Sequence, residues 1–224
     1  MYKRQGQRGL SQLALALQAE VSARHLSWLE TGKAAPSRAM VLRLAERLEL
    51  PLRERNGLLA AAGFAPLYRE RALGDKALAP ARDALQRLLT AHEPWPALAV
   101  DRHWNLVAHN RMLPLLLQGL PPALLAPPAN VLRVSLHPQG LAPMIVNLAA
   151  WRALPGPEAD EGDESFDDVV VPLSLNTPLG RLEFITTITV FGAPHDVTLS
   201  EIAIETLLPA DETTAERLRQ LAAA

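Results

Sequence analysis

Apolar residues recur three and four positions apart through the N-terminal part of the chain, which is the spacing of one helix face. Two short helices are predicted, the first capped by Ser11 and the second by Ser22, with a tight turn between them. Ser37 is placed to cap a third helix, and Pro51 to open a fourth that ends at Gly63. The residues expected to face a shared core are Leu13, Ala16, Leu17, Leu26, Leu29, Met40, Val41, Leu44, Ala45, Leu48, Leu52, Leu58 and Leu59.

From Pro80 onward the pattern changes to short apolar runs between turn residues. The predicted elements are a helix over 81–91, a hairpin of strands 96–100 and 105–108, short helices within 113–151, strands over 169–175, 182–191 and 202–208, and a last helix over 211–221. Residues 202–208 fit both periods, and the alternation of Ile202, Ile204 and Thr206 favours a strand. The order predicts an α+β protein, an all-α bundle followed by an antiparallel sheet with flanking helices.

Charge divides the chain into two unlike parts. Residues 1–71 carry a net charge of +6 and residues 72–224 carry −8, which gives the whole chain −2. Only the N-terminal part is therefore suited to approach a polyanion. The chain has no cysteine, which excludes disulfides, thiolate metal sites and a cysteine nucleophile. The leucine-rich stretch 113–125 is interrupted by proline and glycine, so we expect a cytoplasmic protein with no membrane segment.

The stretch from Leu10 to Ser37 carries the clearest motif. Three blocks follow one another in order, Leu10-Ser11-Gln12, Val21-Ser22 and Glu30-Thr31-Gly32-Lys33-Ala34-Ala35-Pro36-Ser37. They resemble the Cro/repressor (XRE-type) helix-turn-helix family, whose five-helix domain lays the second helix of the motif into the DNA major groove. The resemblance implies DNA contacts from Gln12, Ser22, Ala23, Arg24, Ser27, Trp28 and Lys33.

The chemistry of these side chains suggests a role for each. Arg24 can donate to a guanine edge, while Ser27 and Trp28 can make polar or apolar base contacts. Gln12 can touch a phosphate or brace the recognition helix, and Lys33 can contact the DNA backbone. The alternatives are an exposed helix with arginine and serine for solubility, a Trp28 packed under the following loop, and a Lys33 that is an ordinary turn lysine.

Two features depart from the family pattern. Glu20 stands in the turn where the family usually has glycine, and a left-handed backbone there would cost a non-glycine residue roughly 1–2 kcal/mol. Its carboxylate would also lie near the DNA phosphates. Only Gly6 to Gly9 precede the motif once Met1 to Gln5, which resemble translated adaptor sequence, are set aside. We therefore expect a truncated first helix.

Further blocks lie in the second half of the chain: Leu106-Val107-Ala108-His109-Asn110, Asn130-Val131-Leu132-Arg133, and Phe191-Gly192-Ala193-Pro194-His195-Asp196-Val197-Thr198-Leu199 followed by Pro209-Ala210-Asp211. They resemble the MmyB-like ligand-binding domain, which has a PAS-like fold and often follows an XRE-type helix-turn-helix. The resemblance implies a pocket for a fatty-acid-like or other apolar ligand. Family members usually continue after Ala153 with a long helical stretch, which this chain is expected to lack.

The pocket residues that we infer lie between the predicted sheet and its helices. They are Trp104, Leu106, Met144, Phe184, Ile188 and Ile204, with Asn110 as a polar anchor. Each of them could instead be an ordinary core residue, which is the more frequent role for any single apolar side chain.

An enzyme and a protein-interaction module are the alternative functions. The four histidines His103, His109, His137 and His195 have no metal-ligand spacing, and the chain has no phosphate-binding glycine loop, no HExxH motif and no nucleophile elbow. We therefore predict no catalytic residue, no metal and no cofactor. An antitoxin-like partner binder that uses its helix-turn-helix only for autoregulation stays open.

The sequence thus predicts a DNA-binding transcription regulator with a ligand-sensing domain. Residues 1–63 are expected to form the helix-turn-helix domain, 64–78 a linker and 79–224 the ligand-binding domain. Because one such module binds DNA weakly, a homodimer on an inverted repeat of double-stranded DNA is expected.

Overall fold

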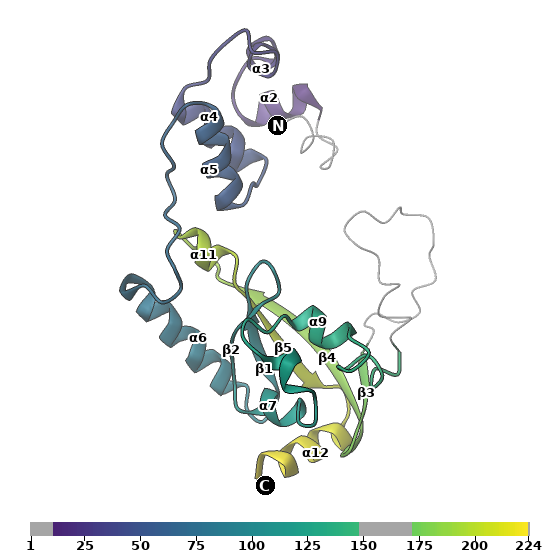
Figure 1. Cartoon of the computed structure of the whole chain (residues 1–224). Coiled ribbons are helices and arrows are strands. Elements are labelled where there is room, and N and C mark those ends of the chain that lie inside the picture. The colour runs from purple at the N-terminus through teal and green to yellow at the C-terminus, as the bar shows by residue number, and fades with distance from the viewer. Residues whose placement is uncertain (1–10, 148–171, 224) are drawn as a thin grey trace. The chain divides into compact units, whose positions relative to one another are not determined.

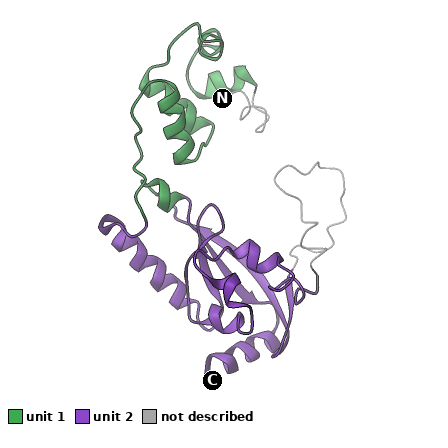
Figure 2. Ribbon diagram, viewed as in Figure 1, with its two compact units in different colours: residues 1–72, 193–200 green, residues 73–192, 201–224 purple. Residues whose placement is uncertain are grey.

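The structure is a computed structural model that describes residues 11–147 and 172–223. It divides into two compact units, coloured green and purple in Figure 2. The N-terminal unit holds residues 1–72 and 193–200, and the sheet unit holds residues 73–192 and 201–224. The architecture is α+β, as the sequence predicts. The expected truncation of the first helix and the expected loss of a helix after Ala153 concern residues outside the described ranges.

The first four described helices of the N-terminal unit follow the predicted order, and the fifth was not predicted (Figure 1). They are α2 (Gln12–Gln18), α3 (Ala23–Glu30), α4 (Arg38–Arg47), α5 (Leu52–Ala61) and α11 (Val197–Ser200). Three serines cap α2, α3 and α4, because the hydroxyls of Ser11, Ser22 and Ser37 each accept a hydrogen bond from the backbone N–H three residues later. These caps confirm the helix starts read from the sequence.

The core of the N-terminal unit is built mainly from leucine and alanine. Its buried residues are Leu15, Ala16, Ala19, Leu26, Leu44, Ala45, Leu48 and Leu50. The prediction that Leu13 and Leu17 face inward is wrong, because they are 60% and 71% exposed. Helix α2 carries two apolar stripes, and Leu15 and Ala19, also four residues apart, point into the core instead.

Residues 193–200 join β4 to β5 along the chain, yet they belong to the N-terminal unit. The buried carboxylate of Asp196 accepts a hydrogen bond from Arg71 at 2.9 Å. The amide of Val197 donates to the carbonyl of Arg69, and the hydroxyl of Thr198 donates to the carbonyl of Arg71. The segment that follows α5 is also bound by α5 itself, because Asn56 makes three hydrogen bonds with the backbone of residues 67–68. The segment after α5 is thus held from both sides.

The sheet unit contains five antiparallel strands in the order β2-β1-β5-β4-β3 (Figure 1). They are β1 (Ala97–Val100), β2 (Leu106–His109), β3 (Leu173–Thr177), β4 (Gly180–Val190) and β5 (Ala203–Pro209). The helices are η1 (Lys76–Leu78), α6 (Ala79–Ala91), α7 (Met112–Leu116), α8 (Pro122–Leu125), α9 (Val131–Leu136) and α12 (Glu212–Ala223). The hairpin and the strand over 202–208 are confirmed. No described helix is long and apolar enough to cross a membrane.

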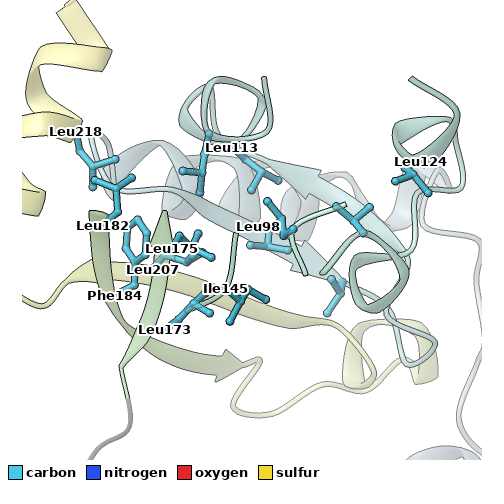
Figure 3. Packing of buried hydrophobic residues seen from close by; sticks show 14 residues of the cluster. Leu98, Leu113, Leu124, Ile145, Leu173, Leu175, Leu182, Phe184, Leu207 and Leu218 are labelled. Atoms are coloured by element: carbon cyan, nitrogen blue, oxygen red, sulfur yellow. The ribbon is translucent and has the colours of Figure 1, made fainter. Parts of the chain in front are cut away.

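One face of the sheet carries the main core of this unit (Figure 3). Alternate residues of the strands point to this face, among them Leu98 of β1, Leu175 of β3, Phe184 of β4 and Leu207 of β5. Leu218 of α12 packs beside Leu182 of β4, while α7, α8 and α9 supply the other side of the core. Asp211 caps α12 by accepting from the amide of Thr214, as predicted.

Candidate functional site

Helix α3 presents an arginine and a tryptophan together on its outer face. The guanidinium of Arg24 lies over the ring of Trp28, 4.6 Å from the ring centroid. Trp28 is 39% exposed, so part of its ring faces solvent. A cation–π contact at an exposed site stabilises by about 0.5–1 kcal/mol, and Arg24 stays exposed while making it.

The neighbouring side chains of α3 divide between this face and the core. Ser27 lies three residues from Arg24 and is half-buried. Ala23, which was predicted to contact DNA, is half-buried and packs against the core cluster, so that prediction is corrected. Ser22 is exposed, but its hydroxyl accepts from the amide of His25 and so holds the helix start. The outer face is therefore made by Arg24, Ser27 and Trp28.

Gln12 and Lys33 both lie near the C-terminal end of α3. The Gln12 amide donates to the Glu30 carboxylate, which places Gln12 as a brace on the end of α3. The chain turns at Gly32, whose φ of 72° favours glycine, and the amide of Lys33 then donates to the carbonyl of Trp28. Lys33 is exposed.

The turn between α2 and α3 has a left-handed backbone at Glu20, the conformation that the family pattern indicated there. Glu20 has a φ of 56°. Arg43 of α4 stabilises the turn, because its Nη1 donates to the carbonyl of Ala19 at 3.2 Å and lies 3.8 Å from the Glu20 carboxylate. Glu20 and Arg43 are both largely exposed, so solvent screens this ion pair.

In the sheet unit, a cavity of about 430 Å³ lies between the core face of the sheet and α7, α8 and α9. Its volume is within the range of small-molecule sites, about 300–1,000 Å³. The lining is almost entirely apolar, and its large exposed residues Leu132, Leu136 and Ile188 lie where the cavity meets solvent. The polar residues of the lining are Ser135, Thr186 and Glu205.

The turn between β1 and β2 positions one wall of this cavity. The carboxylate of Asp101 accepts from the amides of His103 and Asn105 and from the Asn105 side chain. Burial acts to raise the pKa of Asp101, but these hydrogen bonds outweigh it and the pKa is lowered. Trp104 takes a φ of 64° in this turn and its carbonyl accepts from the amide of Val131, which ties the turn to α9.

The structure places the predicted pocket residues in three settings. Trp104, Leu106 and Ile188 line the cavity. Met144 and Phe184 lie outside the lining, because Phe184 is fully buried in the core cluster and Met144 packs against that cluster. Ile204 is buried on the opposite face of the sheet, since it alternates with Glu205 along β5.

Asn110 is a structural residue outside the cavity lining, which corrects its predicted place as a polar anchor. It is 2% exposed and makes four hydrogen bonds to backbone groups. Its oxygen accepts from the amides of Ala97 and Met112, and its nitrogen donates to the carbonyls of Leu89 and Trp95. These bonds use the full capacity of the amide, so no donor or acceptor is left for a ligand.

Glu205 is the lining residue with charge chemistry that the sequence reasoning missed. Burial among apolar side chains raises the pKa of its carboxyl group. The alternation of β5 places Glu205 and Ile204 on opposite faces of the strand, but it does not say which face lines the cavity. Among the described residues, no group of three His, Cys, Asp or Glu side chains could hold a metal ion.

Two family models match successive parts of the chain. A helix-turn-helix domain model matches residues 3–58, and the model of the MmyB-like transcription regulator ligand binding domain matches residues 81–154. A solved structure of an RNA-binding light-oxygen-voltage receptor aligns with 100% of this chain, at 16% sequence identity and a TM-score of 0.31. This chain spans 62% of the length of that receptor chain. No curated protein matches the chain. The chain therefore carries a helix-turn-helix domain followed by an MmyB-like ligand-binding domain, the domains of a DNA-binding transcription regulator with a ligand-sensing part.

Proposed function

We propose that α3 reads base edges in the major groove with Arg24, Ser27 and Trp28. The observation that carries this proposal is the stacked pair on the outer face of α3, where Arg24 keeps its donors exposed beside the ring of Trp28. An arginine in this position can donate two hydrogen bonds to a guanine while the tryptophan contacts an apolar base edge. Around α3, Ser22 caps the start of the helix and Gln12 braces its end through Glu30. Lys33 contacts the DNA backbone.

The chain acts as a homodimer on an inverted repeat. Non-specific contact by one module gives dissociation constants of roughly 10⁻⁴ to 10⁻⁶ M, whereas specific binding needs about 10⁻⁸ M or tighter. Two copies on adjacent half-sites supply the difference without additional contacts from each copy.

Footprinting together with sedimentation of the bound complex tests the homodimer. Two protomers per protected site, with equal protection of both half-sites, is the expected result. A single protomer bound to its full site would refute the dimer.

The cavity of the sheet unit binds a small ligand with a fatty-acid-like apolar chain. Support comes from its volume of about 430 Å³ and from a lining in which leucine, isoleucine and valine predominate. Burying an apolar chain there is favourable by about 25 cal/mol for each Å² removed from water, and few directional contacts are needed.

The chain itself offers a route from this cavity to the DNA-binding unit. Strands β4 and β5 both contribute to the cavity lining, and residues 193–200 that join them pack within the N-terminal unit. A ligand that shifts β4 against β5 therefore acts on the Asp196–Arg71 pair and on the segment after α5. This is the differential interaction that a ligand needs if it is to change DNA affinity.

Titration of fatty acids and of primary alcohols with ten, fourteen and sixteen carbons into the complex with DNA tests this regulation. A change in DNA affinity with at least one chain length is expected. Unchanged affinity across the series, with binding of the same compounds to the protein verified, would contradict ligand control.

A further inference from the structure

The cavity lining holds one ionisable side chain among the residues that the structure describes, and it is an acid. Glu205 lies on the central strand β5, opposite Leu98 of β1 and Ile188 of β4. Its two neighbours across the sheet are apolar, and the described lining includes no lysine, arginine or histidine. A ligand carboxylate would therefore meet a second carboxyl group and no cation.

The carboxyl group of Glu205 also has no hydrogen-bond or ion-pair partner among the described residues. A polar group that is partly withdrawn from water without a partner is costly, and a donor on a ligand removes that cost. Thr186 and Ser135 are the other polar lining residues, and both are neutral. The strongest hydrogen-bond acceptor of the cavity is thus the carboxyl group of Glu205, on the wall that the sheet forms.

We propose that the cavity selects apolar ligands whose polar end donates a hydrogen bond or carries a positive charge, and that Glu205 receives that end. This rests on the proposed function, which assigns an apolar ligand to the cavity, and adds the chemistry of the ligand's polar end. A free fatty carboxylate is disfavoured, whereas an alcohol or amine on the same chain fits. The raised pKa of Glu205 agrees with this setting, because an unpaired carboxylate is destabilised there until a donor arrives.

Binding of three compounds with one chain length tests the proposal on the full-length protein. Decylamine, decanol and decanoate are titrated at neutral pH, with calorimetry as the readout. Hydrogen bonds to charged groups are strong, so wild type should bind decylamine at least tenfold more tightly than decanoate, with decanol between them.

Three variants assign the preference to the side chain. Glu205→Gln keeps the size and one acceptor, so it should weaken decylamine about tenfold and leave decanol nearly unchanged. Glu205→Leu removes the acceptor, so decylamine should lose its advantage over decanoate, and decanol should bind at least as tightly as either ion. Thr186→Val is the matched control, because it removes another polar lining group and should leave the order of affinities unchanged. If Glu205→Leu does not fold, Glu205→Gln carries the test alone.

The outcomes separate this proposal from the proposed function. Equal binding of the three compounds by wild type, or an unchanged order in the Glu205 variants, overturns the role of Glu205 while leaving an apolar site in place. Absence of binding by all three overturns both the role of Glu205 and the ligand assignment of the cavity. DNA binding, measured in the same preparation without any added compound, tests the function of α3 independently.

Discussion

Replacing Glu20 separates backbone strain from charge in the turn of the helix-turn-helix. Glu20 has a φ of 56°, which costs a non-glycine residue roughly 1–2 kcal/mol. Glycine removes that strain but adds about 0.4–1 kcal/mol of conformational entropy to the unfolded chain. Loss of the exposed ion pair with Arg43 costs about 0–1 kcal/mol, and Glu20→Gln shares that loss. Glu20→Gly should therefore be more stable than Glu20→Gln by roughly 0.5–1 kcal/mol.

The same pair of variants tests where the DNA backbone passes. A carboxylate about 8 Å from a phosphate is repelled by roughly 0.5 kcal/mol in water, so its removal should tighten DNA binding about twofold. Both variants should show this gain equally, and salt should reduce it.

Urea unfolding gives the stabilities, and fluorescence anisotropy with a labelled duplex gives the affinities at two salt concentrations. Equal stability of Glu20→Gly and Glu20→Gln would refute the strain argument. Unchanged affinity of Glu20→Gln at low salt would refute the placement of the turn beside a phosphate.

Three further predictions concern hydrogen-bonded side chains and carboxyl groups with a shifted pKa. Asn110→Ala leaves four backbone groups without their side-chain partner and should lower the free energy of unfolding by about 3 kcal/mol; a loss below 1 kcal/mol would show that water replaces these bonds. Asp196→Asn removes the charge that binds Arg71, so amide exchange of residues 67–72 should quicken at least tenfold, and unchanged exchange would refute the anchoring role. The two perturbed carboxyls should give opposite pH slopes in urea unfolding. The lowered pKa of Asp101 contributes stability above the pKa of the unfolded chain that is lost as pH falls through the folded value, so Asp101→Asn should flatten the acid limb. The raised pKa of Glu205 contributes stability below the pKa of the unfolded chain that is lost as pH rises through the folded value. Glu205→Gln should therefore be more stable than wild type near neutral pH. Equal slopes in wild type and both variants would contradict both assignments.

Element types could be read from the sequence wherever local chemistry and periodicity agreed. Ser11, Ser22 and Ser37 each combine a capping side chain with an apolar repeat, and all three start helices as predicted. Residues 202–208 were the hardest to assign, since a short apolar run fits both periods, and the pairing of β5 with β1 and β4 decides for the strand.

The direction of side chains was less predictable than the type of element. In α2, the stripe of Leu13 and Leu17 is as apolar as the stripe of Leu15 and Ala19, and only the packing of α3 and α4 decides which is buried. In β5, alternation groups Ile202 with Ile204 but does not say which face carries the cavity.

The two candidate sites also differ in how far the sequence predicts them. The outer face of α3 could be predicted because Arg24, Ser27 and Trp28 share a helix face at fixed spacing. The polar residue of the cavity could not be predicted, because Asn110 directly follows the apolar strand β2 and Glu205 lies within β5, and both positions suit a polar group of a pocket. The side chain of Asn110 uses all its hydrogen-bonding capacity on backbone groups from four sequence positions. Glu205 reaches the cavity through the pairing of its strand.

Selection of bound sequences from a random duplex pool, with wild type and Arg24→Ala side by side, tests the central claim most directly. Wild type should enrich an inverted repeat, and Arg24→Ala should lose discrimination at one base pair in each half-site, by about 1–3 kcal/mol. Enrichment of no sequence by wild type would contradict base reading by α3. A uniform loss of affinity over all sequences in Arg24→Ala would make Arg24 a phosphate contact instead.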